Sequence, residues 1–245
     1  TVDMMGVDPR RFGPYATRGY LKEKNEEAYA NVFTTHYPDE ERSAARPLKT
    51  APCYDRMKAL GAVFGSVYGW ERPNWFMPSA DYSLSVEELN QEDPAKVLMN
   101  KNHATALEDG RIVEKNSFRR SNYFEHVGNE CKHVNDKVGL LDMSAFAKCI
   151  VKGPGAEEWL EYIFANKMPK AIGRISLVHM LSLNGGVRAE FTVYKTGPQS
   201  YYLVSAGAFE THDHDYLFKL APKDGSVNIQ RVTTQTGVLV LAGPR

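Results

Sequence analysis

The sequence predicts an α+β fold, with an antiparallel sheet packed by helices in the C-terminal part and a helical, loop-rich N-terminal part. Residues 175–202 hold three β-rich runs, separated by Asn184-Gly185-Gly186 and by Thr196-Gly197-Pro198. Gly and Asn accept the positive φ angles that tight turns require, so these separators predict a meander of three antiparallel strands. Apolar and polar residues alternate along the second run, which predicts one apolar face and one polar face.

Two helices are expected before residue 78. Thr17 is suited to cap a helix that runs to about Tyr37, with Pro38 as its stop. A second helix is expected from Tyr54 to about Val67, because apolar residues recur there at helical spacing. The apolar stripes are Tyr20, Leu21, Ala28, Val32 and Phe33 in the first helix and Met57, Leu60, Val63, Phe64 and Val67 in the second, with Gly61, Gly65 and Gly69 inside the second helix or at its end. No strand is expected in residues 1–55.

The C-terminal half alternates helices and strands. A helix from a capping Ser121 to Val138 is followed by a strand around residues 148–151. The turn Gly153-Pro154-Gly155 then leads into a helix, and after the meander a helix is expected over residues 208–220, with two short strands at the end. The apolar residues of the first two helices are Phe124, Val127, Cys131, Val134 and Val138, and Trp159, Leu160, Ile163 and Phe164.

Charge and composition exclude several classes of partner. The 245 residues carry 30 basic and 30 acidic side chains and a net charge of zero, and no run of like charges stands out. We therefore expect neither a nucleic-acid partner nor a membrane partner. No apolar stretch approaches the length of a membrane span, and the N-terminus lacks the pattern of an export signal.

The three cysteines favour a reducing compartment. Cys53, Cys131 and Cys149 are odd in number, far apart and free of CxxC spacing, so neither a disulfide framework nor a zinc site is supported. Each lies among apolar neighbours, and we expect buried, unreactive thiols.

Glu190 is the candidate functional residue of the meander. In the second run it alternates with the apolar set, so its carboxylate points away from the apolar face. It is either a solvated carboxylate on the polar face of a half-buried sheet or an acid that binds a ligand. His212 and His214 invite a metal hypothesis, but residues two apart do not share a helix face, so we expect no metal site.

Several long motifs resemble one known family, the dimethylglycine and sarcosine dehydrogenases. They extend over nearly the whole chain apart from a polar stretch over residues 79–116. The motifs are Asp8-Pro9-Arg10-Arg11-Phe12-Gly13, Arg46-Pro47-Leu48-Lys49-Thr50-Ala51-Pro52-Cys53-Tyr54-Asp55-Arg56, Gly69-Trp70-Glu71-Arg72-Pro73, Ser117-Phe118-Arg119-Arg120-Ser121-Asn122-Tyr123-Phe124 and Leu140-Leu141-Asp142-Met143-Ser144.

The resemblance implies a division into three parts. Residues 1–78 resemble the end of the central domain of an FAD-dependent oxidoreductase, residues 79–116 form a polar insertion or linker, and residues 117–245 resemble the N-terminal half of an aminomethyltransferase-like folate-binding domain. We expect the chain to be an internal fragment of a longer polypeptide. A domain absent from this chain would hold the FAD, and the 245 residues alone are not expected to be active.

The resemblance also implies an activity. Members of this family oxidise an N-methyl amine with FAD, and tetrahydrofolate captures the one-carbon unit. Small-molecule amine and folate would be the ligands, and the remaining domains or a flavin subunit the protein partners. The implied location is the bacterial cytoplasm or the mitochondrial matrix. The alternative, drawn from a branch of the same family, is a non-catalytic regulatory or scaffolding subunit.

Individual site residues follow from the resemblance. Glu190 falls where the family carries an acid after the Gly-Gly hairpin, where it would hydrogen-bond the folate and assist proton transfer. Arg188 and Ala189 would contact the cofactor through their backbones, and Asp142 and Phe146 would lie near the pocket. The aminomethyltransferases differ in having Tyr and Asn where Leu177 and Ala206 stand here.

Overall fold

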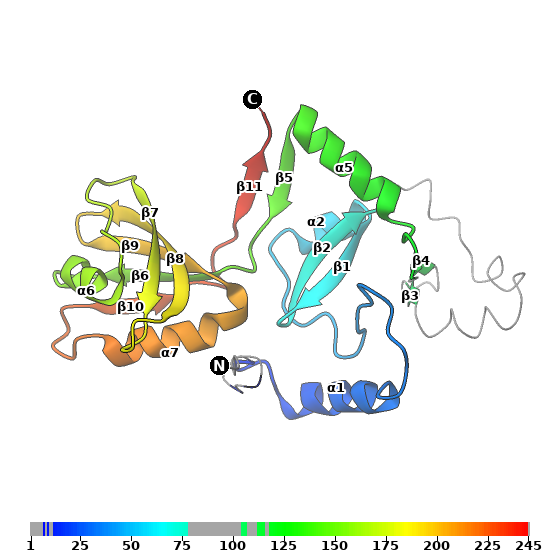
Figure 1. The fold of residues 1–245 in the computed structure, drawn as a ribbon, viewed down its shortest axis with the longest axis horizontal. Coiled ribbons are helices and arrows are strands. Elements are labelled where there is room, and N and C mark those ends of the chain that lie inside the picture. The colour runs from blue at the N-terminus through cyan, green and yellow to red at the C-terminus, as the bar shows by residue number, and fades with distance from the viewer. Residues whose placement is uncertain are drawn as a thin grey trace, which may run out of the picture. The chain divides into compact units, whose positions relative to one another are not determined.

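The computed structural model describes residues 12–77 and 118–244, together with Val7, Pro9 and the backbone of two short strands at 104–106 and 112–115. The chain divides into two compact units (Figure 1). One comprises residues 1–14 and 143–238, and the other comprises residues 15–142 and 239–245. The predicted α+β class is confirmed, because antiparallel sheets and helices make up both units.

The first unit is built on a five-stranded antiparallel sheet in the order β10-β6-β9-β8-β7. Its elements are β6 (Ala147–Lys152), α6 (Ala156–Ile163), β7 (Ile175–Leu181), β8 (Val187–Gly197), β9 (Ser200–Ser205), the short helix η4 (Gly207–Phe209), α7 (Glu210–Leu220) and β10 (Asn228–Arg231). The predicted meander is confirmed as β7, β8 and β9, which pair in sequence order. The helices predicted around residues 156–164 and 208–220 are confirmed as α6 and α7.

Helices α6 and α7 pack against one face of this sheet, which we call the helix-covered face. Alternate residues of β6 to β9 point into it and meet the apolar side of both helices. The buried set is Cys149, Val151, Ala156, Trp159, Leu160, Ile163, Phe164, Met168, Val178, Met180, Phe191, Val193, Tyr201, Leu203, Leu217 and Val227. Burying each large apolar side chain of this kind stabilises the fold by about 1.5–3 kcal/mol. This face holds the core of the unit.

The opposite face, which we call the outer face, carries the intervening residues. They are Lys148, Ile150, Ile175, Leu177, His179, Glu190, Thr192, Tyr194, Tyr202 and Val204. Ile175 and Leu177 remain 58% and 51% exposed. The outer face is therefore a mixed apolar and polar surface that α6 and α7 do not cover.

The second unit contains a hairpin that corrects the sequence prediction. The helix expected from Tyr54 to Val67 ends early, as α2 (Tyr54–Ala59), and Gly61 then adopts a φ of 88°. The chain continues as β1 (Ala62–Val67) and β2 (Trp70–Phe76), joined by Tyr68 and Gly69, both with positive φ. The prediction was wrong because the apolar spacing that fits a helix also places Val63 on the buried side of a strand.

The first predicted helix is also shorter than expected. It forms α1 (Arg18–Ala30), and the predicted cap is confirmed because the Thr17 hydroxyl accepts the amide of Tyr20. The helix ends at Asn31, whose side chain and backbone both donate to the carbonyl of Glu27. No residue of α1 is buried and Phe33 is 99% exposed, so the predicted apolar stripe forms no buried face among the described residues, although the ring of Tyr20 meets that of Tyr15 edge-on at 5.5 Å.

Helix α5 (Phe124–Asp136) packs on the β1–β2 hairpin. Val63, Trp75 and Met77 form a small core against Tyr123 and Val127. The helix begins three residues after Ser121 and ends before Val138, and no side-chain hydrogen bond caps its start, so the predicted serine cap was wrong. The three cysteines are free, but only Cys149 is buried, whereas Cys131 lies exposed on α5 and Cys53 is intermediate. The prediction of three buried thiols was therefore wrong for these two.

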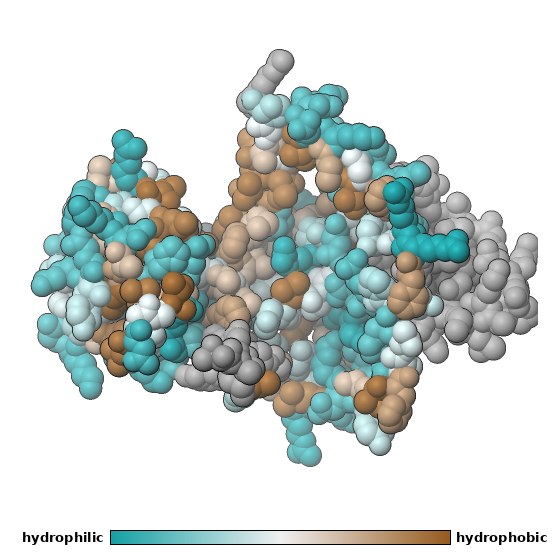
Figure 2. All heavy atoms as spheres, in the orientation of Figure 1, coloured by the Kyte–Doolittle hydropathy of each residue, from teal (hydrophilic) through white to brown (hydrophobic). Residues whose placement is uncertain are grey.

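The second unit also contains two short ribbons. The strands β3 (Ala104–Ala106) and β4 (Ile112–Lys115) pair with each other, and the rest of the predicted polar insertion at 79–116 lies outside the described residues. The strand β5 (Gly139–Asp142) pairs with β11 (Leu239–Ala242). Figure 2 shows apolar side chains gathered over this second ribbon, which exposes Leu140, Leu141, Leu239, Val240 and Leu241. The proposed division at residues 78 and 116 stays a prediction.

None of the helices that the structure describes is long and apolar enough to cross a membrane.

Candidate functional site

The candidate site lies at the β7–β8 hairpin, whose turn follows from its sequence. Gly185 has a φ of 78°, which residues with a Cβ rarely adopt. Ser182 closes the turn, because its hydroxyl accepts the amide of Gly186 at 3.1 Å and its own amide donates to the Gly186 carbonyl at 2.8 Å. The predicted Asn184-Gly185-Gly186 turn is confirmed, and it brings the start of β8 beside the end of β7.

Glu190 lies on the outer face, as the alternation predicts. Its cross-strand partner is His179, and Nε2 of His179 is 3.3 Å from Oε2 of Glu190. The side chains of His179 and Glu190 are 37% and 59% exposed. The pair forms an ion pair when the imidazole is protonated. The carboxylate is thus accessible to a ligand and adjacent to an imidazole, which can donate or accept hydrogen bonds.

The side chain of Arg188 does not lie on the outer face, although strict alternation along β8 would place it on the same face as Glu190. Met180 pairs with Ala189 but Leu181 pairs with Val187, so one extra residue, Arg188, is inserted into β8. A bulge of this kind turns its side chain away from the direction that strict alternation gives. The guanidinium lies on the side of α7, where its carbon is 4.1 Å from the ring centroid of Tyr216.

The side chain of Arg188 is held by a buried acceptor. Its Nη2 is 2.7 Å from Nε2 of His212, and Nδ1 of His212 is 3.2 Å from Oδ1 of Asp213. His212 and Asp213 are 4% and 3% exposed. This contact involves only the side chain of Arg188, so its predicted role as a backbone contact stays a prediction.

The remaining predicted residues, Ala189, Phe146 and Asp142, come from three different segments of the chain. Ala189 pairs with Met180 and packs partly against the helix-covered core, directly before Glu190. Phe146 lies in the turn before β6, where its amide donates to the carbonyl of Met143 at 3.2 Å. Asp142 ends β5 in the other unit and pairs with Leu239.

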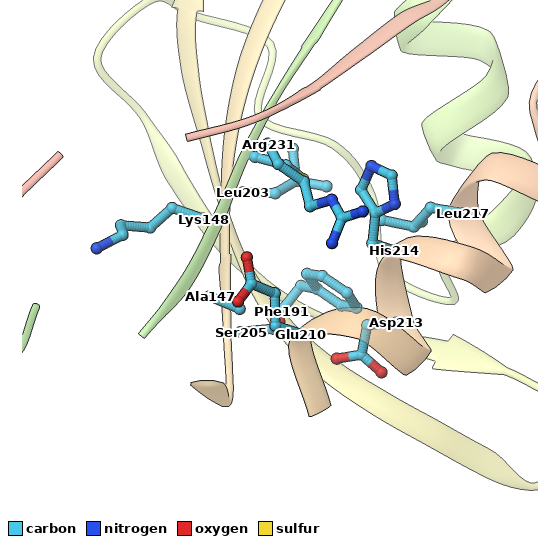
Figure 3. Close-up of a pocket in the computed structure, with 11 residues that line it drawn as sticks. Ala147, Lys148, Phe191, Leu203, Ser205, Glu210, Asp213, His214, Leu217 and Arg231 are labelled. Atoms are coloured by element: carbon cyan, nitrogen blue, oxygen red, sulfur yellow. The ribbon is translucent and has the colours of Figure 1, made fainter. Parts of the chain in front are cut away.

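A small cavity lies on the helix-covered face, between the sheet and α7 (Figure 3). Its volume is about 20 Å³, which is room for about one water molecule and far too little for a folate. Arg231 and His214 point toward each other across it, whereas Lys148 points away. The lining residues are Ala147, Lys148, Cys149, Phe191, Leu203, Ser205, Glu210, Asp213, His214, Leu217 and Arg231.

The ionisable groups of this cavity are tuned by burial. Burial raises the pKa of the Cys149 thiol to about 12, and the charges of Asp213 and Glu210 add to the effect. Burial also lowers the pKa of His214, with a further contribution from Arg231. A thiol with so high a pKa is neutral and a poor nucleophile. The part of the chain that the structure describes holds no group of three His, Cys, Asp or Glu side chains that could bind a metal.

Glu157 is the second distinctive acid of this unit, and it is fully engaged. One oxygen accepts from Lys195 Nζ at 2.7 Å and from the Tyr201 hydroxyl at 2.5 Å, and the other accepts from Lys170 Nζ at 2.8 Å. Hydrogen bonds from Lys170, Lys195 and Tyr201 lower the pKa of Glu157 to about 2. Because its oxygens accept three hydrogen bonds from within the chain, the Glu157 carboxylate has a structural role. The Glu190 carboxylate, by contrast, is exposed and accessible to a ligand.

Sequence reasoning missed His179 and the role of His212. The first could have been found by counting across the hairpin, because the turn at residues 184–186 brings position 179 opposite position 190. The second had no sequence signal, since the bulge that brings Arg188 to α7 is not encoded by a recognisable local pattern.

Comparison with known proteins identifies the class of domain. Residues 53–245 match the family described as the GCVT N-terminal domain, and residues 1–51 match the FAD dependent oxidoreductase central domain. The chain therefore belongs to the GCVT N-terminal domain family. A solved structure of glycine cleavage system aminomethyltransferase T from Bartonella henselae has the same fold, with 21% identity and a TM-score of 0.54 over 81% of this chain and 41% of that one.

The relatives with curated names confirm the predicted resemblance. The chain is 34% identical to mouse dimethylglycine dehydrogenase over 245 residues, which are 99% of this chain and 24% of the relative. It is 28% identical to the mouse pyruvate dehydrogenase phosphatase regulatory subunit, over 98% of this chain and 25% of the relative. The chain thus spans about a quarter of the length of these relatives.

Proposed function

We propose that this chain is part of an FAD- and tetrahydrofolate-dependent oxidative N-demethylase of a methylated glycine or a related amine, and that its GCVT-type region binds folate. The observation that carries the proposal is the similarity to dimethylglycine dehydrogenase along 99% of the chain, in which a segment of the oxidoreductase family precedes a GCVT-type segment. The FAD would be held by a domain outside this chain, and the 245 residues alone would not be active.

The outer face supplies groups that suit a folate. Bound tetrahydrofolate would supply the nucleophilic nitrogen that captures a one-carbon unit. The Glu190 carboxylate accepts hydrogen bonds from N–H groups, and it is accessible on this face. It would take a proton from the attacking nitrogen, and His179, 3.3 Å away, would pass the proton on.

Backbone groups near Glu190 support the same proposal. The bulge removes Arg188 from the ladder with β7, and the pairing of β8 with β9 begins only at Thr192. The peptide groups of Arg188 are therefore suited to hydrogen-bond a planar ligand edge, and Ala189, which pairs with Met180, stays proposed as the second backbone contact. Asp142 and Phe146 remain proposed as residues near the pocket.

The partners and location follow from the same proposal. A small-molecule amine would be the substrate, and the remaining domains of the polypeptide or a flavin subunit would complete the enzyme. The mitochondrial names of the dimethylglycine dehydrogenases support a mitochondrial matrix location, and the bacterial cytoplasm is the counterpart in a bacterium.

A regulatory or scaffolding subunit is the second candidate function. The observation that favours it is the 28% identity to a phosphatase regulatory subunit over 98% of the chain. In that case the outer face would contact protein rather than folate.

Titration calorimetry separates the two candidates. Tetrahydrofolate is titrated into the longest polypeptide that contains these residues, in unsubstituted form, with Glu190→Gln and with Glu158→Gln. Glu158 is an exposed acid on α6 and makes the same charge change away from the outer face. We expect Glu190→Gln to weaken binding by about tenfold and Glu158→Gln to leave it unchanged. Absence of binding in a polypeptide that extends through the whole folate domain would contradict the enzyme proposal and favour the scaffold.

A further inference from the structure

The side chains of Arg188, His212 and Asp213 form a hydrogen-bond chain that connects the candidate hairpin to helix α7. Arg188 leaves β8 at the bulge and contacts His212 and Tyr216, which are four residues apart and therefore on one side of the helix. The Tyr216 hydroxyl also lies 3.4 Å from the carbonyl of Leu181, the last residue of β7. Both strands of the hairpin are thus attached to the same side of α7.

The chemistry of the contact fixes the state of His212. A guanidinium only donates hydrogen bonds, so Nε2 of His212 must accept from Arg188. The ring proton is then on Nδ1, where it can donate to Asp213 Oδ1 at 3.2 Å. His212 is therefore a neutral imidazole with its proton on Nδ1, between a cation and an anion.

The charges at the two ends compensate each other in a buried environment. Burial raises the pKa of Asp213, and hydrogen bonds from His212 and Ser205 and the charge of Arg188 oppose this effect. The Nε of Arg188 is buried and has no hydrogen-bond partner among the described residues. The guanidinium consequently depends on His212 and on the Tyr216 ring for its position.

We propose that His212 is a positioning residue that holds the Glu190-bearing hairpin against α7, through a buried hydrogen-bond chain from Asp213 to Arg188. Without it the bulged start of β8 loses its anchor, and the register that pairs His179 with Glu190 loosens. The importance of this for ligand binding rests on the proposed function, whereas the structural link does not.

The first test needs no substitution. Long-range proton–nitrogen NMR correlations of the 245-residue chain report which ring nitrogen of each histidine carries the proton. We expect His212 to be neutral with the proton on Nδ1. A proton on Nε2, or a doubly protonated ring at neutral pH, would overturn the proposal, because Arg188 could then not donate to it.

Two variants of His212 separate positioning from packing. The amide of Gln reaches the position of Nε2 and can accept from Arg188, whereas the shorter Asn reaches only the position of Nδ1 and can serve Asp213 alone. We expect amide hydrogen exchange at residues 187–191 to be about tenfold faster in His212→Asn and nearly restored in His212→Gln. Amides of β6, which lies two strands away from β8 in the same sheet, serve as the control for global unfolding.

Each outcome decides between the alternatives. Equal acceleration in both variants, or equal acceleration in β6, would show that His212 serves packing and would overturn the positioning role. Tetrahydrofolate titration of the same variants in the longest polypeptide gives a separate result, with weaker binding expected for Asn than for Gln. If the unsubstituted protein binds no folate, the proposed function fails, while the exchange result still decides the role of His212.

Discussion

The two faces of the five-stranded sheet differ in how their side chains are used. On the helix-covered face Phe191 and Val193 are almost completely buried, and the charged group at its margin, Glu157, has three donors. On the outer face Ile175 and Leu177 are more than half exposed, and Glu190 faces His179 with its carboxylate accessible. The first face accounts for the stability of the unit. Apart from the buried Lys148, the second carries apolar and ionisable groups that this stability does not require, which is typical of a binding surface.

The largest expected effect is on the helix-covered face. Phe191→Ala removes a side chain that is 2% exposed and whose ring centroid is 5.2 Å from that of Phe164. We expect the free energy of unfolding to fall by about 3–5 kcal/mol, because the cavity is only partly refilled. Urea unfolding measures it, with Tyr194→Ala on the outer face as the comparison. A similar loss for both variants would remove the distinction between the faces.

The Lys148→Met variant tests how much a buried charge on the outer face contributes to the free energy of unfolding. It is 2% exposed, and its Nζ donates to the carbonyls of Ser144 at 2.8 Å and Thr236 at 2.6 Å. We expect Lys148→Met to cost about 1–3 kcal/mol, because two carbonyls lose a charged donor. Lys152→Met, on the same strand and face but exposed, should change the unfolding free energy by about 0.5 kcal/mol or less. A neutral Lys148→Met would mean that these carbonyls are satisfied without the amine.

The contribution of Glu157 to the stability of the fold is expected to depend on pH. Its folded-state pKa is lowered to about 2 from a usual 4.5, so its stabilisation is complete above pH 4.5 and is lost as the pH falls through about 2. Because the carboxylate is partly exposed, we expect Glu157→Gln to cost only about 1 kcal/mol at neutral pH. Thermal unfolding between pH 7 and pH 2 should show a shallower decline for this variant than for Glu158→Gln. Parallel declines would contradict the assignment.

The smallest effect on stability is expected at Glu190. The pair with His179 is exposed, and exposed ion pairs contribute about 0–1 kcal/mol. We expect Glu190→Gln to change the free energy of unfolding by about 0.5 kcal/mol or less, measured by urea unfolding at neutral pH. A loss above about 2 kcal/mol would indicate a structural role and weaken the case for a ligand.

Local sequence signals predicted the fold where turn chemistry and alternation agreed. The meander was predictable because Gly185 meets a positive φ and because apolar residues alternate along β8. The β1–β2 hairpin was missed because its turn places Tyr68 at a positive φ, which the residue type does not signal. The apolar spacing therefore predicted a helix to Val67, whereas residues 62–67 form a strand because they pair with β2.

The candidate site was predictable only in part. Alternation put Glu190 on the correct face, and hairpin register would have added His179. The direction of Arg188 depends on a one-residue bulge and on acceptors in α7 that lie 24 residues away in the sequence. Tertiary contacts of this kind leave no local periodicity.

The most direct test of the difference between the two faces is methyl NMR of the longest folate-domain polypeptide during titration with tetrahydrofolate. Leu177 reports on the outer face, while its neighbour Val178 reports on the helix-covered face. We expect the methyl signals of Ile175 and Leu177 to shift on binding, while those of Val178 and Val193 stay in place. Shifts confined to the buried methyls, or no shift at saturating folate, would contradict a folate site beside Glu190.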